Sequence, residues 1–473
     1  MNLAELIHNF ERFFIVYFLL LQASYLSLNL LSIHFVSGYL KRHSNALDID
    51  IHTGLEPPIS ILVAVKNEQE LIAGSIKALL QLEYREFEIV VINDGSTDDT
   101  LKILKEEFKL VEFPDTSRKR LKTKTVEAVY HSTTQQNLKV LDKHNGGKAD
   151  ALNAGINYAN YPLYCSIDAD SILQTDSLRK IVTPFMERSD TVAAGGTVRV
   201  ANGCHVEDGF LVKTGLSSNF LVTLQVVEYL RAFLFGRLGW GPLNALLIIS
   251  GTFGVFHRET VVEAGGYRTD TVGEDMELVT RLHRYLKKIG KPYHISFVPD
   301  PICWTEVPST LGVLRKQRIR WQHGLIESLL MNYQLPFSLK GGAAGWLAFP
   351  FMFLFECLGP IIEISGYLFF IAGLYLGLIS IETGILFFFL ALGIGVLLSM
   401  LALLLEEMSF HIYTQPRQFF RLLLAAVIEN FGYRQLCALW RYWGVCTWLI
   451  SGKSHWHDVQ RSRDWAEHRK NMI

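Results

Sequence analysis

The stretch at residues 317–321 carries side chains whose types and spacing suit a sugar and its diphosphate leaving group. It reads Gln-Arg-Ile-Arg-Trp. In a helix, Gln317, Arg320 and Trp321 share one face, and Arg318 points about 100° away. Arginine can donate two parallel hydrogen bonds to phosphate oxygens, and tryptophan has a flat apolar ring with an N–H at its edge. The same composition is typical of a helix at the level of the lipid headgroups, so the stretch alone leaves both interpretations open.

Two carboxylates end an apolar run farther upstream. Residues 164–167 read Tyr-Cys-Ser-Ile, and Asp168 and Asp170 follow, separated by one alanine. If the strand continues through them, its period of two puts both carboxylates on one side. There they can share a hard divalent cation that also takes oxygen from a diphosphate. A lone Asp-x-Asp is most often a loop, and this one is more specific because it ends an apolar run.

A basic loop and an acidic pair add to this chemistry. Residues 144–148 read His-Asn-Gly-Gly-Lys and precede a helical stretch, so the turn and Lys148 suit an anion. The spacing differs from that of a Walker A loop. Glu274 and Asp275 open a second helical stretch. The helix dipole favours acidic residues there, but capping does not need two carboxylates.

The elements that must position these residues alternate between strands and helices. Apolar runs at residues 59–65, 88–94 and 139–143 alternate with helical spacing at residues 70–82, 96–108 and 149–159. This order predicts parallel βαβ units, whose ligands bind beyond the carboxyl ends of the strands. Asn67, Glu68 and Asp94 lie at two of these ends.

Three further stretches belong to the expected α/β part. Charged residues between 111 and 136 predict a solvated excursion. Residues 220–240 are apolar but interrupted by charges, so we expect a helix that lies against the membrane or the domain. Residues 246–257 predict a strand. Its glycines would let a ligand approach the backbone at Gly251, Thr252 and Phe253.

The remaining apolar residues predict membrane helices. The chain has 473 residues, a net charge of −1 and a mean hydropathy of +0.21, which gives no sign of a nucleic-acid partner. Residues 13–36 form an almost uncharged run that suits a retained anchor rather than a cleaved signal. Lys41 and Arg42 follow it, so the positive-inside rule places the next domain in the cytoplasm. The six scattered cysteines are expected to be reduced thiols and not zinc ligands.

These patterns divide the chain into six expected regions. They are an anchor at 1–40, a linker at 41–57, a catalytic domain at 58–306, interfacial helices at 307–340, transmembrane helices at 341–451 and a cytoplasmic tail at 452–473. Residues 346–380 are too long for one straight crossing and contain prolines and glycines, so we expect a kinked helix or a hairpin. A multi-pass protein of the inner (plasma) membrane with a cytoplasmic catalytic domain follows.

The motifs occur in the order found in membrane-bound family 2 glycosyltransferases. The chain resembles this family, which includes cellulose, hyaluronan and poly-N-acetylglucosamine synthases, over about residues 57 to 330. The resemblance lies in Asn-Asp-Gly-Ser around Asp94, residues 145–153, the Asp-x-Asp, the Glu-Asp pair and residues 317–321. It implies an α/β GT-A fold with a mostly parallel sheet, a UDP-sugar donor, a Mg²⁺ or Mn²⁺ ion, and a β-linked product of one inverting displacement.

The resemblance also implies residue roles. Asp275, with Glu274 beside it, is the expected general base, and Asp168 and Asp170 are the expected metal ligands. The expected donor-binding residues are Asn67, Glu68, Asp94, Lys148, Asp150, Asp168, Gln317, Arg318 and Arg320. The expected acceptor-binding residues are Trp321, Gly251, Thr252 and Phe253.

The expected activity is processive transfer to a growing β-linked polysaccharide at the lipid bilayer, with export or accessory subunits as possible partners. Two alternatives stay open: transfer of one sugar to a lipid-linked acceptor, and a catalytically inactive membrane protein that binds nucleotides. The first strand ends in Val-Lys-Asn-Glu where many relatives have an aromatic residue before the Asn, and Asn93 stands where many have Asp. Both departures concern the nucleotide end of the site.

Overall fold

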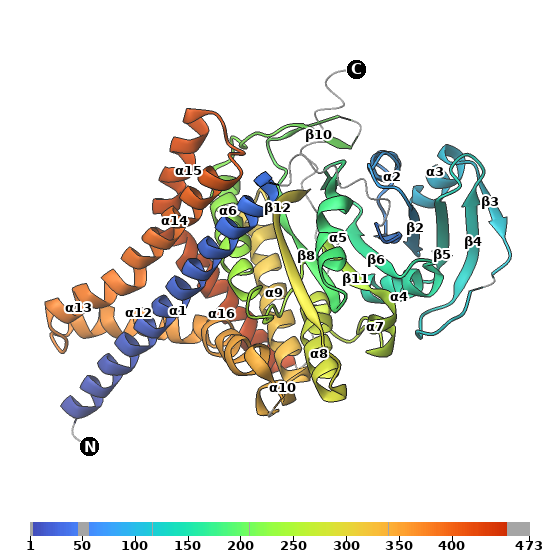
Figure 1. Cartoon of the computed structure of the whole chain (residues 1–473). Coiled ribbons are helices and arrows are strands. Elements are labelled where there is room, and N and C mark those ends of the chain that lie inside the picture. The colour runs from blue at the N-terminus through green and yellow to red at the C-terminus, as the bar shows by residue number, and fades with distance from the viewer. Residues whose placement is uncertain (1–2, 46–55, 116, 208, 339, 452–473) are drawn as a thin grey trace.

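A ten-stranded sheet forms one part of the molecule, and long apolar helices form the other (Figure 1). The computed structural model describes residues 3–45, 56–115, 117–207, 209–338 and 340–451. The strand order is β3-β4-β5-β2-β1-β6-β11-β8-β12-β7, and β9 and β10 form a separate hairpin. The strands are β1 (Ile59–Val65), β2 (Phe87–Asp94), β3 (Leu110–Phe113), β4 (Val126–Ser132), β5 (Leu138–Lys143), β6 (Leu163–Asp168), β7 (Ile172–Leu173), β8 (Thr191–Val200), β9 (His205–Glu207), β10 (Phe210–Lys213), β11 (Phe253–His257) and β12 (His294–Thr305).

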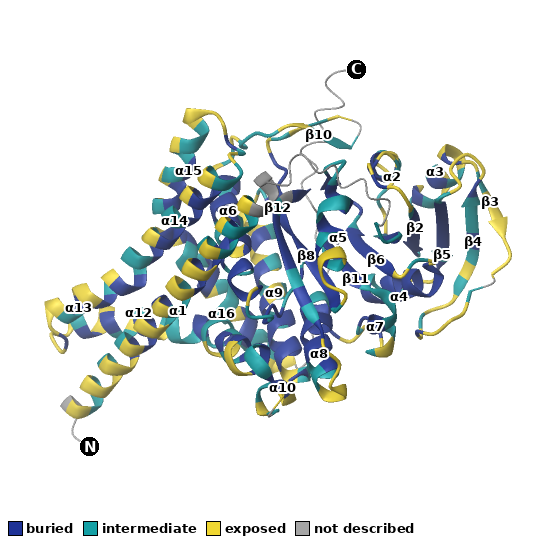
Figure 2. Ribbon diagram, in the orientation of Figure 1, coloured by how far each residue is buried: buried dark blue, intermediate teal, exposed yellow. Residues whose placement is uncertain are grey.

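The centre of the sheet is parallel, as the alternation of strands and helices predicts. β5, β2, β1 and β6 run parallel to one another. Their residues are buried almost throughout, which suits strands covered on both faces (Figure 2). The helices α2 (Ile72–Leu80), α3 (Thr100–Glu107) and α4 (Lys148–Tyr158) come between them in the chain. The α/β fold class is therefore confirmed.

The sheet as a whole is mixed, so the prediction of a mostly parallel sheet holds only for its centre. β11 is antiparallel to both β6 and β8, and β7 is antiparallel to β12, whereas β8 and β12 are parallel. At the other edge, β3 and β4 pair antiparallel within the stretch expected to be a solvated excursion. β3 is largely exposed at the edge of the sheet, so its one charged residue, Glu112, can remain in water while the backbone pairs with β4.

Residues 246–252 are irregular, so the strand expected at 246–257 is limited to β11. Helix α8 (Glu274–Ile289) explains the difference, because its side chains bind the backbone of this segment. Thr280 Oγ1 donates to the carbonyl oxygen of Leu247 at 3.3 Å, and His283 Nε2 lies 2.9 Å from the carbonyl oxygen of Leu246. These carbonyls are satisfied without a neighbouring strand.

Helices join the sheet to the membrane part. The expected helix at residues 220–240 is present but broken, and one of its pieces, α6, packs against β8 and against two membrane helices. The helices of this region are α5 (Ser177–Glu187), α6 (Phe220–Leu230), the π-helix η1 (Arg231–Phe235), the short 3₁₀-helix η2 (Leu238–Trp240), α7 (Arg258–Glu263), α9 (Leu311–Met331) and α10 (Gln334–Phe337).

Within the described residues, three helices are long and apolar enough to cross a membrane, and a bent pair makes a fourth candidate. The spans are Glu5–Lys41, Ile381–Ser409 and Pro416–Ser451, and the pair Ala344–Cys357 and Gly359–Tyr375 is bent by 46°. The bend agrees with the kink or hairpin expected there. Their main elements are α1 (Leu3–Asn45), α12 (Gly359–Tyr375), α13 (Ile381–Phe388), α14 (Ile394–Ser409), α15 (Pro416–Ile428) and α16 (Arg434–Ser451).

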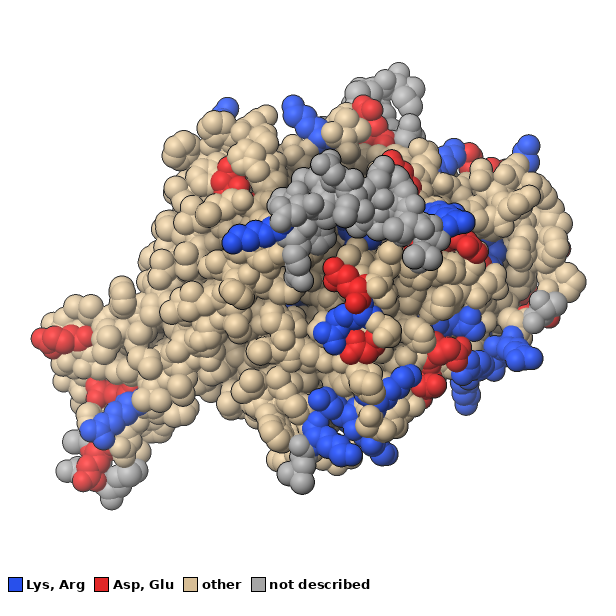
Figure 3. All heavy atoms as spheres, in the orientation of Figure 1, with Lys and Arg blue, Asp and Glu red and all other residues tan. Residues whose placement is uncertain are grey.

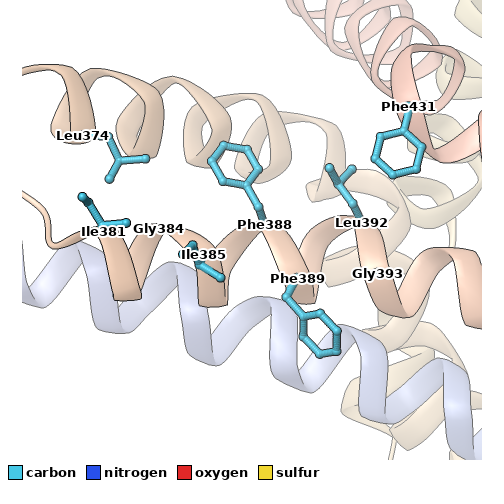
Figure 4. A pocket seen from close by; sticks show the side chains of 9 residues that line it. All are labelled: Leu374, Ile381, Gly384, Ile385, Phe388, Phe389, Leu392, Gly393 and Phe431. Atoms are coloured by element: carbon cyan, nitrogen blue, oxygen red, sulfur yellow. The ribbon is translucent and has the colours of Figure 1, made fainter.

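The ends of the expected regions differ in detail. α1 continues through residue 45, into the expected linker, and most of the remaining linker and the whole expected tail lie outside the described residues. The last span is interrupted, because Phe431 and Gly432 have non-helical backbone angles. An apolar pocket of about 540 Å³ lies between α12, α13 and this break, with Leu374, Phe388 and Phe431 in its wall (Figure 4).

Charged side chains are distributed unevenly on the face that Figure 3 shows. They are frequent over the sheet part and sparse over the helical arm, except at its tip. Two ion pairs join the two parts: Arg199 of β8 and Glu406 of α14 form a buried pair, and the half-buried Arg231 of η1 pairs with the buried Glu429 at 2.6 Å. A buried charge without a partner is costly. Each of these arginines therefore favours the one arrangement of the two parts in which its glutamate is within reach.

Candidate active site

Lys148 and Asp168 form the centre of the candidate site. Lys148 opens α4 directly after the Gly-Gly turn, and Asp168 ends β6. The ammonium of Lys148 pairs with Asp168 and donates to the carbonyl oxygen of Gly251 at 3.0 Å. Burial lowers the pKa of Lys148, but the charges of Asp168 and Glu274 outweigh burial, and the net shift is upward. Lys148 therefore remains a cation and connects the tip of β6 to the turn before β11.

The backbone at Gly251 links this pair to Asp275. The N–H of Gly251 donates to Asp275 Oδ2 at 3.0 Å, and the N–H of Met276 donates to Asp275 Oδ1 at 2.8 Å. A Cβ atom at residue 251 would lie only 3.2 Å from Lys148 Nζ and 3.5 Å from Asp275 Cβ. A side chain at residue 251 would crowd both charged groups, which bind the carbonyl oxygen and the N–H of this glycine. Lys148, Asp168, Gly251 and Asp275, which are far apart in the sequence, thus meet where β6 ends and β11 begins.

Glu274 lies deeper than Asp275 and is only 8% exposed. Burial raises the pKa of Glu274 to about 7, and the charges of Lys148 and Arg320 oppose this shift. Both cations are therefore near enough to influence the carboxylate. Glu274 thus shares the first turn of α8 with Asp275, within electrostatic reach of Lys148 and of Arg320 on α9.

A close contact between two glycines fixes α8 against α9. A Cβ atom on Gly273 would lie 2.7 Å from Gly324 Cα, and one on Gly324 would lie 2.8 Å from Gly273 Cα. Hydrogen bonds flank this contact: Thr271 Oγ1 donates to Glu327 Oε2 at 2.8 Å, and Ser328 Oγ donates to the carbonyl oxygen of Gly273 at 3.2 Å. The acidic pair at the start of α8 is therefore held beside the middle of α9.

The stretch at residues 317–321 is helical, as expected, but its side chains have different environments. Trp321 is 44% exposed, and the guanidinium carbon of Arg318 lies 4.5 Å from the centre of its ring. Arg318 is buried, and its Nη2 atom donates to Glu228 Oε2 at 2.7 Å. Gln317 Oε1 is buried and has no hydrogen-bond partner among the described residues. Arg318 thus packs on the ring of Trp321 and, through its ion pair with Glu228, joins α9 to α6.

The loop before Lys148 is held by charged residues that sequence reasoning assigned only in part. Asp94 accepts from the N–H groups of Gly146 at 2.9 Å and Gly147 at 2.8 Å. Lys143 Nζ lies 2.5 Å from Asp94 Oδ1 and 2.7 Å from Asp150 Oδ1. The structure therefore places Asp94 and Asp150 where they shape the loop.

Lys143 was missed because a lysine at the end of a strand resembles a solvated residue. The predicted pairing of the strand at 88–94 with the strand at 139–143 could have revealed its role. Asp94 and Lys143 end neighbouring parallel strands and are partners in the register of β2 and β5. Opposite charges at matched strand ends predict an ion pair.

The tip of β1 holds the other predicted donor residues. Asn67 has a positive φ of 57° and accepts from the N–H of Thr97 at 2.8 Å, while the N–H of Glu68 donates to Thr100 Oγ1 at 2.9 Å. These bonds tie the tip of β1 to the segment after β2.

Two expectations about individual residues need correction. β6 ends at Asp168, and Asp170 lies in the following turn, where the N–H of Ser171 donates to the carbonyl oxygen of Asp168 at 3.0 Å. The period of a strand therefore does not set the relative direction of the two carboxylates. Phe253 is fully buried, and a Cβ atom on Gly196 would touch its ring, so Phe253 belongs to the core and not to an acceptor site. Thr252 lies in the turn before it.

Comparisons with known proteins identify glycosyltransferases. The model of glycosyl transferase family 2 matches residues 60–209, and that of glycosyl transferase family group 2 matches residues 165–400. The poly-beta-1,6-N-acetyl-D-glucosamine synthase of Staphylococcus epidermidis is 30% identical over 276 residues, which are 58% of this chain and 56% of that protein. The synthase of Staphylococcus aureus strain COL is 30% identical over 303 residues, 64% of this chain and 63% of that protein.

The chain thus spans less than two thirds of the length of these relatives. Among solved structures, the mannosyltransferase PcManGT from Pyrobaculum calidifontis in complex with GDP-Man and Mn²⁺ aligns over 88% of this chain and 99% of its own. Its TM-score is 0.46 and its identity 17%, which is too low a likeness to inform the site.

The chain thus combines an α/β sheet whose candidate residues lie at strand ends with an acidic pair and a basic-aromatic helix, and both matching models describe glycosyltransferases. The two matching models together extend from residue 60 to residue 400 and include every candidate site residue. The chain belongs to family 2 of the glycosyltransferases.

Proposed function

We propose that this protein transfers a sugar from a UDP-sugar to a growing β-linked polysaccharide at the membrane, with inversion at the anomeric carbon. The observation that carries the proposal is the convergence of Lys148, Asp168 and Asp275 on the backbone of Gly251. The curated relatives support a glycan product, since they are poly-N-acetylglucosamine synthases. UDP-N-acetylglucosamine is therefore the first donor to test.

Asp275 is the proposed general base. A hydroxyl oxygen of the acceptor attacks the anomeric carbon as its proton passes to the Asp275 carboxylate, and the bond from that carbon to the diphosphate oxygen breaks. UDP leaves with the electron pair. The two backbone N–H groups that bind Asp275 hold its oxygens in place before the reaction.

Cations balance the charge that grows on the departing diphosphate. Lys148 is fixed at the N-terminus of α4, where backbone N–H groups also favour an anion. Arg320 lies near enough to influence Glu274 and can act from the side of α9. Gln317 and Trp321 are the other proposed contacts of donor and acceptor on this helix. Preorganised cations of this kind stabilise the transition state more than the ground state.

A divalent cation, Mg²⁺ or Mn²⁺, belongs to the proposal. Asp168 and Asp170 would hold it, because these ions prefer carboxylate oxygens. Within the described part of the chain, no group of three or more His, Cys, Asp or Glu side chains could hold a metal ion. In the proposal, Asp168 and Asp170 supply two of the oxygens around the ion, and the diphosphate and water supply the others. When bound, it would neutralise charge on the leaving group.

The proposed location is the inner membrane, with several crossings and the sheet part in the cytoplasm, where UDP-sugars are made. The candidate spans and the basic residues after the first of them support this topology. The proposed domains are those expected from the sequence, with α1 extended to residue 45.

The test is a screen of UDP-sugars with the purified full chain, in which released UDP and product length are measured. Asp275→Asn keeps the shape of the side chain but cannot take the proton. Transfer should fall by about two to four orders of magnitude while donor affinity is kept. Wild-type turnover by this variant, or UDP release without any glycosylated product from the unchanged protein, would contradict the proposal.

A further inference from the structure

A cavity with charged side chains in its wall lies beside α4. It has a volume of about 500 Å³ and is enclosed by residues 121–124, by α4 and by the segment at residues 265–270. This volume is typical of sites that bind small ligands. Lys148, Asp168 and Asp275 are not among the residues that line it. The cavity is thus separate from the candidate active site.

Two buried amides of α4 hold the opposite walls of the cavity. Asn153 Nδ2 donates to the carbonyl oxygen of Tyr267 at 2.8 Å, and Asn153 Oδ1 accepts from the N–H of the same residue at 2.7 Å. Asn157, one turn farther along α4, binds the other wall in the same way. Its Oδ1 accepts from the N–H of Leu121 at 2.9 Å, and its Nδ2 donates to the carbonyl oxygen of Leu121 at 2.8 Å. Because both walls are bound to one helix, the cavity has a fixed shape.

The charges in the wall are only partly paired. Arg268 donates to Asp270 Oδ1 at 2.9 Å and to Asp270 Oδ2 at 2.6 Å, so these two charges balance each other. Lys122 and Lys124 also line the cavity, and both are exposed. Among the described residues, neither ammonium group has an ion pair or a hydrogen bond. Two cations are therefore available to a ligand.

The remaining carboxylate in the wall, Asp150, connects the cavity to the active-site loop. It accepts from the backbone N–H of Lys124 at 3.0 Å and lies 2.7 Å from Lys143 Nζ. Lys143 also pairs with Asp94, which binds the turn that precedes Lys148. A change in the wall at residues 121–124 can therefore reach the loop that carries Lys148.

The opposite wall leads to the acidic pair of α8. Asp270 is followed directly by Thr271, whose hydroxyl group donates to Glu327 of α9 at 2.8 Å. Glu274 and Asp275 begin α8 three residues later. Both walls of the cavity thus continue into segments that carry residues of the candidate active site.

The two available lysines favour a phosphate-bearing ligand. An ammonium group has three hydrogen-bond donors and no acceptor, so its partner must carry acceptor atoms, and its charge favours an anion. Phosphate groups supply several charged oxygens, and charge-assisted hydrogen bonds to them are strong. A ligand with two phosphate groups can bind Lys122 and Lys124 at the same time.

We propose that this cavity is an effector site that binds a phosphate-bearing small molecule through Lys122 and Lys124. The ligand acts on transfer through the two walls and is not itself a substrate. The binding part of the proposal does not depend on which reaction the active site catalyses.

The test measures the binding of pyrophosphate to the full chain in detergent, by calorimetry with excess chelator. Lys122→Gln/Lys124→Gln should weaken binding at the cavity about tenfold or more, because two charge-assisted hydrogen bonds are lost. Arg118→Gln/Lys119→Gln is the matched control, since it removes two cations of the same segment that do not line the cavity. Its affinity should equal that of the unchanged protein.

Lys148→Gln separates the cavity from the proposed donor site. Pyrophosphate should still bind this variant, and adding Lys122→Gln/Lys124→Gln to it should abolish the binding. Loss of all binding in Lys148→Gln alone would overturn the proposal. Equal affinities of the unchanged protein and Lys122→Gln/Lys124→Gln would do so as well, and so would an equal loss in the matched control.

Transfer assays test the effector role. Without added ligand, Lys122→Gln/Lys124→Gln should transfer sugar at the rate of the unchanged protein, because neither lysine lines the active site. With pyrophosphate, its rate should respond differently from those of the unchanged protein and the matched control. A lower rate without ligand, or the same response in all three proteins, would refute the effector role. If no UDP-sugar supports transfer by the unchanged protein, the proposed function fails, and the calorimetry still decides whether the cavity binds phosphate.

Discussion

Gly324→Ala tests whether the contact between α8 and α9 sets the geometry of the site. The added Cβ atom would lie 2.8 Å from Gly273 Cα and 3.0 Å from Gly273 N. Carbon atoms in good contact are about 3.5–4.0 Å apart, so α9 must move away by about 0.7–1.2 Å. Both contacts are backbone atoms and cannot rotate aside. Overpacking of this kind costs about 1–3 kcal/mol, which a folded protein of this size can survive.

The larger effect should be on catalysis, because α8 carries Asp275 and α9 carries Trp321. A displacement of about 1 Å between reacting groups can cost on the order of 100-fold in rate. We therefore expect kcat to fall by about 10- to 100-fold while the purified variant stays folded. Glycan synthesis and UDP release in detergent measure the rate, and thermal unfolding measures the stability.

Gly312→Ala is the matched control, because it lies on the same helix and an added Cβ atom meets nothing within 4 Å. Its activity should equal that of the unchanged protein. If Gly324→Ala is as active as Gly312→Ala, the contact does not position the site. The same conclusion follows if Gly324→Ala lowers the melting temperature while the fraction that stays folded keeps the full specific activity.

Three further predictions follow from the site. Trp321→Ala should impair acceptor use and spare donor affinity, and normal glycan synthesis by this variant in detergent would make Trp321 a headgroup anchor only. Burial raises the pKa of Glu274 from 4.5 to about 7, so the folded protein retains a proton that the unfolded chain releases in that range. Stability should therefore fall as the pH rises from 4.5 to 7, and thermal unfolding of Glu274→Gln should not show this part of the slope. Lys143→Met leaves the buried carboxylates of Asp94 and Asp150 without their cation, which should lower the free energy of unfolding by about 3–5 kcal/mol. A melting temperature equal to that of the unchanged protein would refute the role of Lys143.

Local patterns in the sequence predicted the centre of the fold well. The apolar runs that became β1, β2 and β5 are continuous and separated by helical spacing, so their signal does not depend on the rest of the chain. β3 was missed because an exposed edge strand of four residues has no hydrophobic period to detect. The irregular segment before β11 was misread as a strand because it is apolar. Its backbone is satisfied by Thr280 and His283, which lie about thirty residues away along the chain.

The site was predicted as a set of motifs but not as an arrangement. Asp168, Lys148 and Asp275 could be named because each stands at a recognisable strand or helix end. The contact of Gly273 with Gly324 could not, since neither glycine lies in a turn and nothing local distinguishes them from other glycines. The pairing of Arg318 with Glu228 likewise depends on how α6 packs against α9.

The ion pairs between the two parts also constrain the order of biosynthesis. Arg199 and Arg231 leave the ribosome well before Glu406 and Glu429, which are their partners. Until the last helices have been made, each of these arginines must remain in water or bind something else. The packing of β8 against α14 and of η1 against the last span can therefore be completed only after those helices have been made, so the two parts of the molecule reach their final arrangement together.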